Sequence, residues 1–249
     1  MIRLAVGVDL REAVALHVFV QSVIERTSQP VSIIPLAEGM LEEVGTDGTN
    51  AFTLSRFLVP YLCDFNGWCI YADSDMLLRA DLAELWAERE RFVFDKGLAV
   101  VQHDYKTRHP KKYIGTDMES DNRDYPRKNH SSLILWNCGH SANNVLTPEF
   151  VREKGGKFLH RFEWLKDEQV GKLSPTWNHL VGETQFARSN NYHFTLGLPG
   201  IRHYADDLGS LPWHQTLLNA LRCPSTNPAH MVNRAQRAKL RNRQNAERG

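Results

Sequence analysis

The 249-residue sequence has no long hydrophobic run. No stretch approaches the roughly eighteen consecutive apolar residues that a membrane-spanning helix requires. The chain also starts directly in a strand-like segment, from Met1 to Gly7, with no signal-peptide pattern before it. We therefore expect a cytoplasmic protein.

Cysteine is scarce and shows no metal-binding or disulfide pattern. The four cysteines are Cys63, Cys69, Cys138 and Cys223, and none of them forms a Cys-x-x-Cys pair. Their density is far below that of a small disulfide-stabilised domain. A reducing compartment fits this usage.

The sequence lacks internal repeats, Gly-Ser linkers and any compositional break that would separate two domains. Its content of 42% hydrophobic and 24% charged residues is ordinary for a globular protein. We expect one large domain over residues 1–229, because a chain of this length can bury a proper core.

Charge is unevenly distributed, although the net charge is only +1. Residues 230–249 hold six of the 30 basic residues and one of the 29 acidic ones, which leaves 24 basic and 28 acidic residues in the body. We expect this basic tail to be disordered. The alternative is that it contacts nucleic acid or an anionic membrane surface.

The hydrophobic pattern predicts an α/β fold. A strand at residues 2–8, a helix at 11–27 and a strand at 31–35 form a β-α-β opening, which is typical of a parallel sheet. Further helices are predicted at 53–63, 80–90 and 148–162, further strands at 68–72, 97–103, 131–136 and 191–196, and loops at 39–50 and 105–128. The second loop is long and polar, and we interpret it as a candidate wall of an acceptor site.

The most informative stretch is the strand from Trp68 to Ala72, which is followed directly by Asp73-Ser74-Asp75. Side chains two residues apart in an extended chain point to the same face, so Asp73 and Asp75 should converge. A hard divalent cation such as Mg²⁺ or Mn²⁺ resolves the repulsion between two such carboxylates. Asp-x-Asp also occurs in solvated turns and helix caps, and that alternative stays open at this point.

Several ordered motifs resemble family 8 glycosyltransferases. The resemblance begins with Arg56 in Leu54-Ser55-Arg56-Phe57-Leu58, ahead of the strand and its two aspartates, and it spans roughly residues 2–215. The other matching pieces are Val6-Gly7-Val8-Asp9, residues 130–137, Asp167-Glu168-Gln169, Trp177-Asn178 and residues 193–199.

The resemblance implies a GT-A fold, which is Rossmann-like with a central mixed sheet, and a transferase that uses a nucleotide-diphosphate sugar with Mn²⁺. By the same resemblance Asp73, Asp75 and His193 would bind the metal. An imidazole beside carboxylates also favours Mn²⁺ over Mg²⁺. The residues expected to contact the donor are Asp9, Arg56, Ser74, Ser131 and Ser132.

The chain departs from the family pattern in two places. The family usually has a lysine before a Pro-Trp pair after its metal histidine, whereas Leu198 and Leu211 stand before the two candidate prolines here. His203 therefore competes with His193 for the third ligand position, and phosphate binding falls to Arg56 or Arg202. The second departure is that Ser131 and Ser132 occupy the place of an Asn-x-Gly motif.

The resemblance further implies retention of the anomeric configuration, either through a carboxylate nucleophile or through front-face attack by the acceptor. Asp167, Glu168 and Gln169 are the expected residues near a nucleophile position. UDP-glucose and UDP-galactose are the donors expected, and the acceptor stays open.

Two other functions remain as alternatives, namely a nucleotidyltransferase on a similar sheet and a non-catalytic protein that binds a nucleotide sugar or polyanion. No Gly-rich loop with Lys or Arg follows the first strand, which speaks against the nucleotidyltransferase.

Overall fold

A computed structural model of the protein describes residues 1–37, 53–92 and 95–222. The predicted loop at 39–50, the basic tail and Cys223 lie outside these residues.

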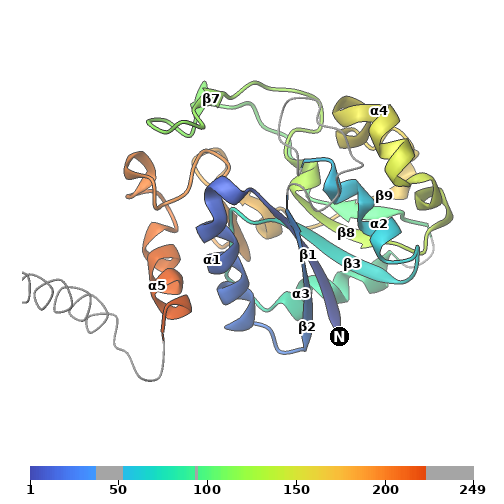
Figure 1. The fold of residues 1–249 in the computed structure, drawn as a ribbon, viewed down its shortest axis with the longest axis horizontal. Coiled ribbons are helices and arrows are strands. Elements are labelled where there is room, and N and C mark those ends of the chain that lie inside the picture. Colours follow the sequence, from blue (N-terminus) through green and yellow to red (C-terminus); the bar gives the residue numbers. More distant parts are fainter. Residues whose placement is uncertain (38–52, 93–94, 223–249) are drawn as a thin grey trace, which may run out of the picture.

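The main sheet has six strands in the order β2-β1-β3-β8-β5-β9 (Figure 1). Only β8 runs antiparallel to its neighbours, so the other five strands end at the same edge of the sheet. This is the mixed α/β sheet that the sequence predicts. The strand bounds are β1 (Ile2–Val8), β2 (Val31–Ala37), β3 (Trp68–Asp73), β5 (Leu98–Val100), β8 (Leu133–Asn137) and β9 (Val170–Lys172).

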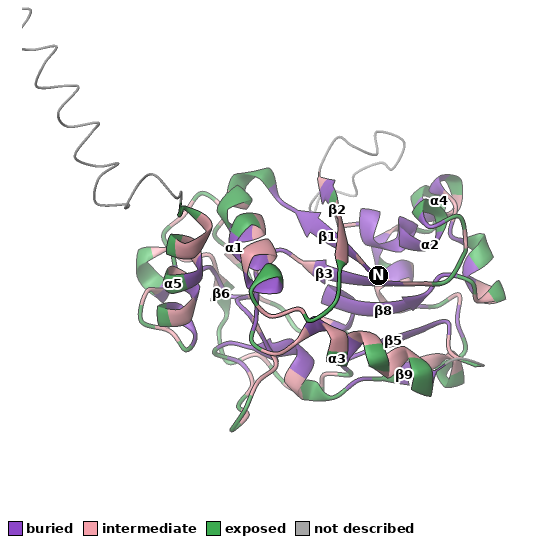
Figure 2. Cartoon of the chain, turned by 90° about the horizontal axis from the view of Figure 1, so that it is seen from below, coloured by how far each residue is buried: buried purple, intermediate pink, exposed green. Residues whose placement is uncertain are grey.

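Helices cover both faces of this sheet, which explains why its central strands are buried along most of their length (Figure 2). Leu4 and Val6 of β1 pack with Phe19 of α1 (Ala13–Ile24), on the face that also holds α3 (Leu82–Ala87). Ala5 points to the other face, toward Phe57 and α4 (Pro148–His160). The alternation along β1 therefore follows from the two-residue strand period.

A second, three-stranded sheet has the order β10-β11-β4 and continues from the first. The chain leaves β3, passes through Ser74 and Asp75, and enters β4 (Met76–Leu78). β4 then pairs antiparallel with β11 (Asn191–His193), which pairs in parallel with β10 (His179–Leu180). The last helix, α5 (Ser210–Ala220), packs beside α1 through Trp213.

The remaining predicted elements are present with changed bounds. The helix expected at 53–63 is a 3₁₀ turn, η2 (Ser55–Leu58), followed by α2 (Val59–Leu62). The helix expected at 80–90 is α3 followed by η3 (Glu88–Arg91). The long loop carries a short hairpin of β6 (Lys111–Lys112) and β7 (Ser120–Asp121). β4, β9, β10 and α5 were not predicted. The other 3₁₀ turns are η1 (Leu10–Glu12), η4 (His130–Ser132), η5 (Ser141–Val145), η6 (Asp167–Gln169), η7 (Pro175–Asn178) and η8 (Arg202–Tyr204).

Within the described ranges, none of the helices combines the length and the apolar character needed to cross a membrane.

Candidate metal centre

Asp73, Asp75 and His193 lie together where the two sheets join. Asp73 is the last residue of β3, and Asp75 stands directly before β4. His193 ends β11 and pairs with Met76, the residue after Asp75. One ligand atom from each of the three side chains lies within 4.8 Å of the others. The convergence of the two aspartates and His193 that we predicted is therefore present in the structure.

The carboxylate of Asp73 is held by a buried arginine and a buried tyrosine. Nη2 of Arg56 lies 3.0 Å from Oδ1 of Asp73, and the hydroxyl of Tyr71 donates to the same oxygen at 2.7 Å. Arg56 is itself anchored, because its Nε donates to the carbonyl of Thr53 and its Nη1 to the carbonyl of Ser131, both at 2.8 Å. Burial raises the pKa of Asp73, and the positive charge of Arg56 opposes this without cancelling it.

The contact between Asp75 and His193 leaves an oxygen without a hydrogen bond. Nε2 of His193 lies 3.2 Å from Oδ1 of Asp75, yet that oxygen is buried and has no hydrogen-bond partner. Burial alone would lower the pKa of His193, but the charges of Asp75 and Asp73 raise it above its ordinary value. A proton on His193 or a bound metal ion would balance the negative charge of the two aspartates.

Asn178 decides which nitrogen of His193 faces Asp75. Nδ1 of His193 lies 2.9 Å from Oδ1 of Asn178, and the amide nitrogen of Asn178 donates to Oγ of Ser132 at 2.8 Å. Because that amide nitrogen is used as a donor, Oδ1 of Asn178 must accept, and Nδ1 of His193 must carry the proton. In the neutral imidazole Nε2 then has a free lone pair, as a metal-binding histidine needs.

These donor atoms fit a divalent cation. Two carboxylates and one imidazole form an oxygen and nitrogen set that suits Mn²⁺ and also admits Mg²⁺. Oδ1 of Asp75 lacks a hydrogen-bond partner, and Nε2 of His193, which has a lone pair when the imidazole is neutral, lies 3.2 Å from it. A cation there would satisfy both of them.

Ser131 and Ser132, which were predicted to bind the donor, are hydrogen-bonded to residues that hold the metal centre. Oγ of Ser131 lies 2.6 Å from Nδ1 of His160, and the carbonyl of Ser131 accepts from Arg56. Oγ of Ser132 donates to the carbonyl of Asn129 at 2.7 Å while it accepts from Asn178. Both hydroxyls are therefore engaged inside the protein.

Ser74 and Asp9 lie at the same edge of the sheet. Ser74 is buried, and its amide donates to the carbonyl of Gly7 at 3.1 Å. Asp9 follows β1 and caps η1, where its carboxylate is paired with Nη2 of Arg11 at 2.6 Å. Burial raises the pKa of Asp9, but the hydrogen bonds and charge of Arg11 bring it below its usual value.

The structure does not bring Asp167, Glu168 and Gln169 to the centre. They form η6 before β9, and the register across the sheet places Val170 level with Cys69 near the start of β3. Asp73 lies four residues beyond Cys69, and η6 ends one residue before Val170, so η6 and Asp73 are separated by roughly 16 Å along the strand direction alone. The reason is that residues before a parallel strand lie at its amino end, whereas the metal centre is at the carboxyl ends.

His203, the competing histidine, is also outside the group. It lies exposed on η8, where its ring contacts Tyr204 edge-on at 4.8 Å. Arg202 on the same turn is exposed as well. His193 is therefore the histidine that joins the two aspartates.

A comparison with known proteins finds a sequence relative. No family model matches the chain. The Arabidopsis thaliana protein named CDI is 37% identical over 218 residues, which cover 82% of this chain and 81% of that protein. The chain belongs to the CDI protein family.

Solved structures show which fold this CDI-family chain has. The galactosyltransferase LgtC, solved with donor and acceptor sugar analogs, matches with a TM-score of 0.58 at 13% identity over 90% of this chain and 98% of LgtC. Mouse xyloside xylosyltransferase 1 matches with a TM-score of 0.51 at 12% identity, over 80% of this chain and 99% of the mouse protein. The bifunctional glycosyltransferase WbbM matches with a TM-score of 0.56 at 14% identity. The match covers 86% of this chain and 51% of WbbM. The fold of the CDI-family chain is that of GT-A glycosyltransferases.

Sequence reasoning missed Glu12, Tyr113 and His103 of the CDI-family chain. The hydroxyl of Tyr113 donates to Oε2 of Glu12 at 3.1 Å, while Oε1 of Glu12 is buried without a partner. Nε2 of His103 is also buried without a partner. Burial, together with the charge of Asp75, raises the pKa of Glu12 to about 8, and burial with the charges of His130 and His193 lowers that of His103 to about 3. Five buried side-chain atoms among the described residues have no hydrogen-bond partner, and three of them belong to Glu12, Asp75 and His103. The charges of the metal centre act on both Glu12 and His103. No local sequence signal marks these two residues.

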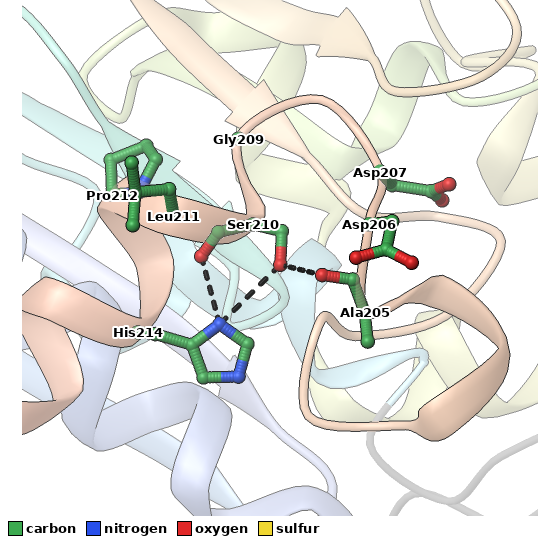
Figure 3. A pocket seen from close by; sticks show the side chains of 8 residues that line it. All are labelled: Ala205, Asp206, Asp207, Gly209, Ser210, Leu211, Pro212 and His214. Atoms are coloured by element: carbon green, nitrogen blue, oxygen red, sulfur yellow. Dashed lines mark hydrogen bonds between the residues drawn. The ribbon is translucent and has the colours of Figure 1, made fainter.

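A separate hollow of about 440 Å³ lies at the start of α5 and contains a serine and a histidine (Figure 3). Nδ1 of His214 lies 2.9 Å from the carbonyl of Ser210, so this nitrogen must donate its proton to the helix backbone. Oγ of Ser210 donates to the carbonyl of Ala205. Both side chains are therefore bonded to backbone carbonyls, which is not the arrangement of a nucleophile with its base. None of the residues that line this hollow belongs to the metal centre.

Proposed function

We propose that this CDI-family protein is a metal-dependent, retaining glycosyltransferase that moves a hexose from a nucleotide-diphosphate sugar to an acceptor. The observation that carries the proposal is the group of Asp73, Asp75 and His193 at the carboxyl edge of a GT-A sheet. The resemblance to family 8 glycosyltransferases supports it, because both place an Asp-x-Asp after the same strand. Ligands of open α/β sheets bind at this edge.

In this proposal Asp73, Asp75 and His193 would hold Mn²⁺, with Mg²⁺ as the alternative. When bound, the metal supplies a positive charge that stabilises the negative charge on the departing diphosphate. Arg56 and Tyr71 keep the carboxylate of Asp73 in place, and both are at least nine-tenths buried.

The donor would be a uridine diphosphate sugar, UDP-glucose or UDP-galactose. LgtC is a galactosyltransferase with a TM-score of 0.58 to this chain, which supports a hexose donor. Asp9 would lie near the nucleotide base, and Ser74 near the sugar or phosphates. Arg56, Ser131 and Ser132 would act on the donor indirectly, because the structure engages their side chains within the protein.

Retention would proceed by front-face attack of the acceptor, with the departing phosphate taking the acceptor proton. A double displacement needs a free carboxylate at the sugar. The carboxylate of Asp9 is paired with Arg11, and the carboxyl group of Glu12 accepts a hydrogen bond from the hydroxyl of Tyr113. Asp167 and Glu168 precede β9 at the other end of the sheet. This arrangement favours the front-face route.

The proposal is tested by incubating the full chain with a panel of nucleotide sugars, with and without Mn²⁺, and measuring hydrolysis by mass spectrometry. We expect Mn²⁺-dependent turnover of at least one UDP-hexose, and we expect Asp75→Ala to abolish it while the circular dichroism spectrum stays unchanged. Asp95→Ala, which alters an exposed carboxylate paired with Lys96, is the matched control and should keep full activity.

Three outcomes would refute the proposal. Full activity of Asp75→Ala would remove the metal role of the aspartate pair. Absence of turnover with every donor, combined with tight nucleotide-sugar binding, would instead favour a non-catalytic binding protein. Release of pyrophosphate from a nucleoside triphosphate would favour the nucleotidyltransferase.

A further inference from the structure

Lys112 is held near the segments that flank the candidate metal centre, because the next residue, Tyr113, is hydrogen-bonded to two of them. The amide of Tyr113 donates to the carbonyl of Leu196 at 2.6 Å, three residues beyond His193. The hydroxyl of Tyr113 donates to Glu12, which follows the carboxyl end of β1. The hairpin of β6 and β7 is therefore fixed at its β6 end to both sides of the centre, and Lys112 is the last residue of β6.

Other cations near the centre are already engaged by protein groups. Arg56 is paired with Asp73, and Arg11 is paired with Asp9. Nζ of Lys128 donates to the side chain of Asn122 at 2.7 Å and lies 3.6 Å from a carboxylate oxygen of Asp124.

Lys112 differs from these cations because it has no carboxylate within ion-pair distance in the part of the chain that the structure describes. Its Nζ lies 5.9 Å from the ring centre of Tyr113. The hydroxyl of the same tyrosine donates to Glu12, so a single aromatic side chain connects the ammonium of Lys112 with the carboxyl group at the end of β1.

We propose that Lys112 binds the diphosphate of the nucleotide-sugar donor, an assignment that rests on the proposed glycosyltransferase function. A divalent cation held by two carboxylates has little net charge left, so a diphosphate beside it needs a further cation. The positions where the family resemblance expects a lysine hold Leu198 and Leu211 instead. An ammonium on a flexible stem is a suitable point charge for phosphate oxygens, and Lys112 supplies it from a different part of the chain.

The test measures binding of inorganic pyrophosphate to the full chain by isothermal titration calorimetry in saturating Mn²⁺. We expect Lys112→Ala to weaken pyrophosphate binding about ten- to a hundredfold, the effect of losing a hydrogen bond to a charged group. Mn²⁺ binding measured alone should stay unchanged. Lys112→Arg, which keeps the charge, should bind within about threefold of the wild type, since roughly 0.7 kcal/mol is a small change.

The neighbouring Lys111 is the matched control, because it has the same charge on the same hairpin but is exposed and paired with Glu119 at 3.1 Å. Lys111→Ala should bind pyrophosphate as the wild type does. Wild-type affinity in Lys112→Ala, or an equal loss in Lys111→Ala, would overturn the assignment of Lys112 alone. Absence of pyrophosphate binding in the wild type with Mn²⁺ bound would overturn both this assignment and the proposed use of a diphosphate donor.

Discussion

The hydroxyl of Tyr71 occupies the space next to Gly7 where any other residue would place its Cβ. A Cβ built on Gly7 would lie 2.1 Å from this hydroxyl. Gly7 pairs with Asp73 across β1 and β3, and the same hydroxyl donates to Asp73. The absence of a side chain at Gly7 therefore lets Tyr71 reach the metal centre.

We expect Gly7→Ala to destabilise the protein by about 1–3 kcal/mol, the usual cost of overpacking a core, and to weaken Mn²⁺ binding by displacing the Tyr71 hydroxyl. Adding Tyr71→Phe should recover stability, because it removes the clashing atom, but not the hydrogen bond to Asp73. Chemical denaturation and Mn²⁺ titration measure the two effects. Gly139→Ala is the control, since its Cβ would meet no atom closer than 3.5 Å. Equal losses at both glycines would contradict the role of Tyr71.

Asn178→Leu should weaken Mn²⁺ binding about ten- to a hundredfold, the usual effect of removing the residue that orients a metal-binding histidine. The substitution leaves Nδ1 of His193 without its acceptor, so the tautomer with a free Nε2 is no longer favoured. Calorimetry with Mn²⁺ measures the affinity, and nitrogen NMR of His193 reports the tautomer. Ser174→Ala, at the exposed residue before the same turn, should change neither. An unchanged tautomer in Asn178→Leu would refute the orienting role.

Glu12→Gln should remove a pH dependence of stability. Burial raises the pKa of Glu12 to about 8 in the folded protein, from its ordinary value of 4.5. Between these two values the unfolded chain releases the proton and the folded chain keeps it, so stability is fully present below about pH 4.5 and falls until about pH 8. At about 1.4 kcal/mol per pKa unit the loss is at most about 5 kcal/mol.

Denaturant unfolding of wild type and Glu12→Gln at pH 5 and at pH 8 measures this dependence. The advantage of the glutamine variant should increase with pH, because glutamine does not ionise. Glu90→Gln, which changes an exposed carboxylate on η3, should show no such increase. A constant difference between wild type and Glu12→Gln at the two pH values would contradict a buried, neutral carboxyl.

Glu168→Gln tests the catalytic role that the sequence resemblance implies for η6. Because η6 lies at the amino end of β9, we expect this variant to keep turnover within about twofold of the wild type, which corresponds to about 0.4 kcal/mol. Asp167→Asn removes an exposed ion pair with Arg127 and should cost at most about 1 kcal/mol of stability. A thousandfold loss of turnover in Glu168→Gln would restore the double-displacement route.

Local patterns in the sequence were enough to predict the order of the first elements and the position of the aspartate pair. The strand β1, the helix α1 and the strand β2 have clear periodicities, and Trp68–Asp73 is a buried strand with a carboxylate at its end. Such patterns depend on residues a few positions apart, which is why they can be recognised without the fold.

The bounds of the shorter elements could not be predicted in the same way. β9 has three residues, and its direction and place beside β5 come only from pairing with a strand about seventy residues earlier. The sequence placed Asp167, Glu168 and Gln169 near the chemistry by motif order, whereas the direction of β9 sends them to the other edge of the sheet.

The amino-acid order by itself established an α/β chain with two carboxylates after a central strand, because hydrophobic alternation and residue spacing act over short distances. Tertiary structure alone decided that His193 and not His203 joins them, that Asn178 sets its tautomer, and that Tyr113, next to Lys112, bonds to Leu196 and Glu12. Each of these contacts joins segments that are distant in the chain, and strand register and hairpin anchoring bring such segments together only when the whole sheet has formed.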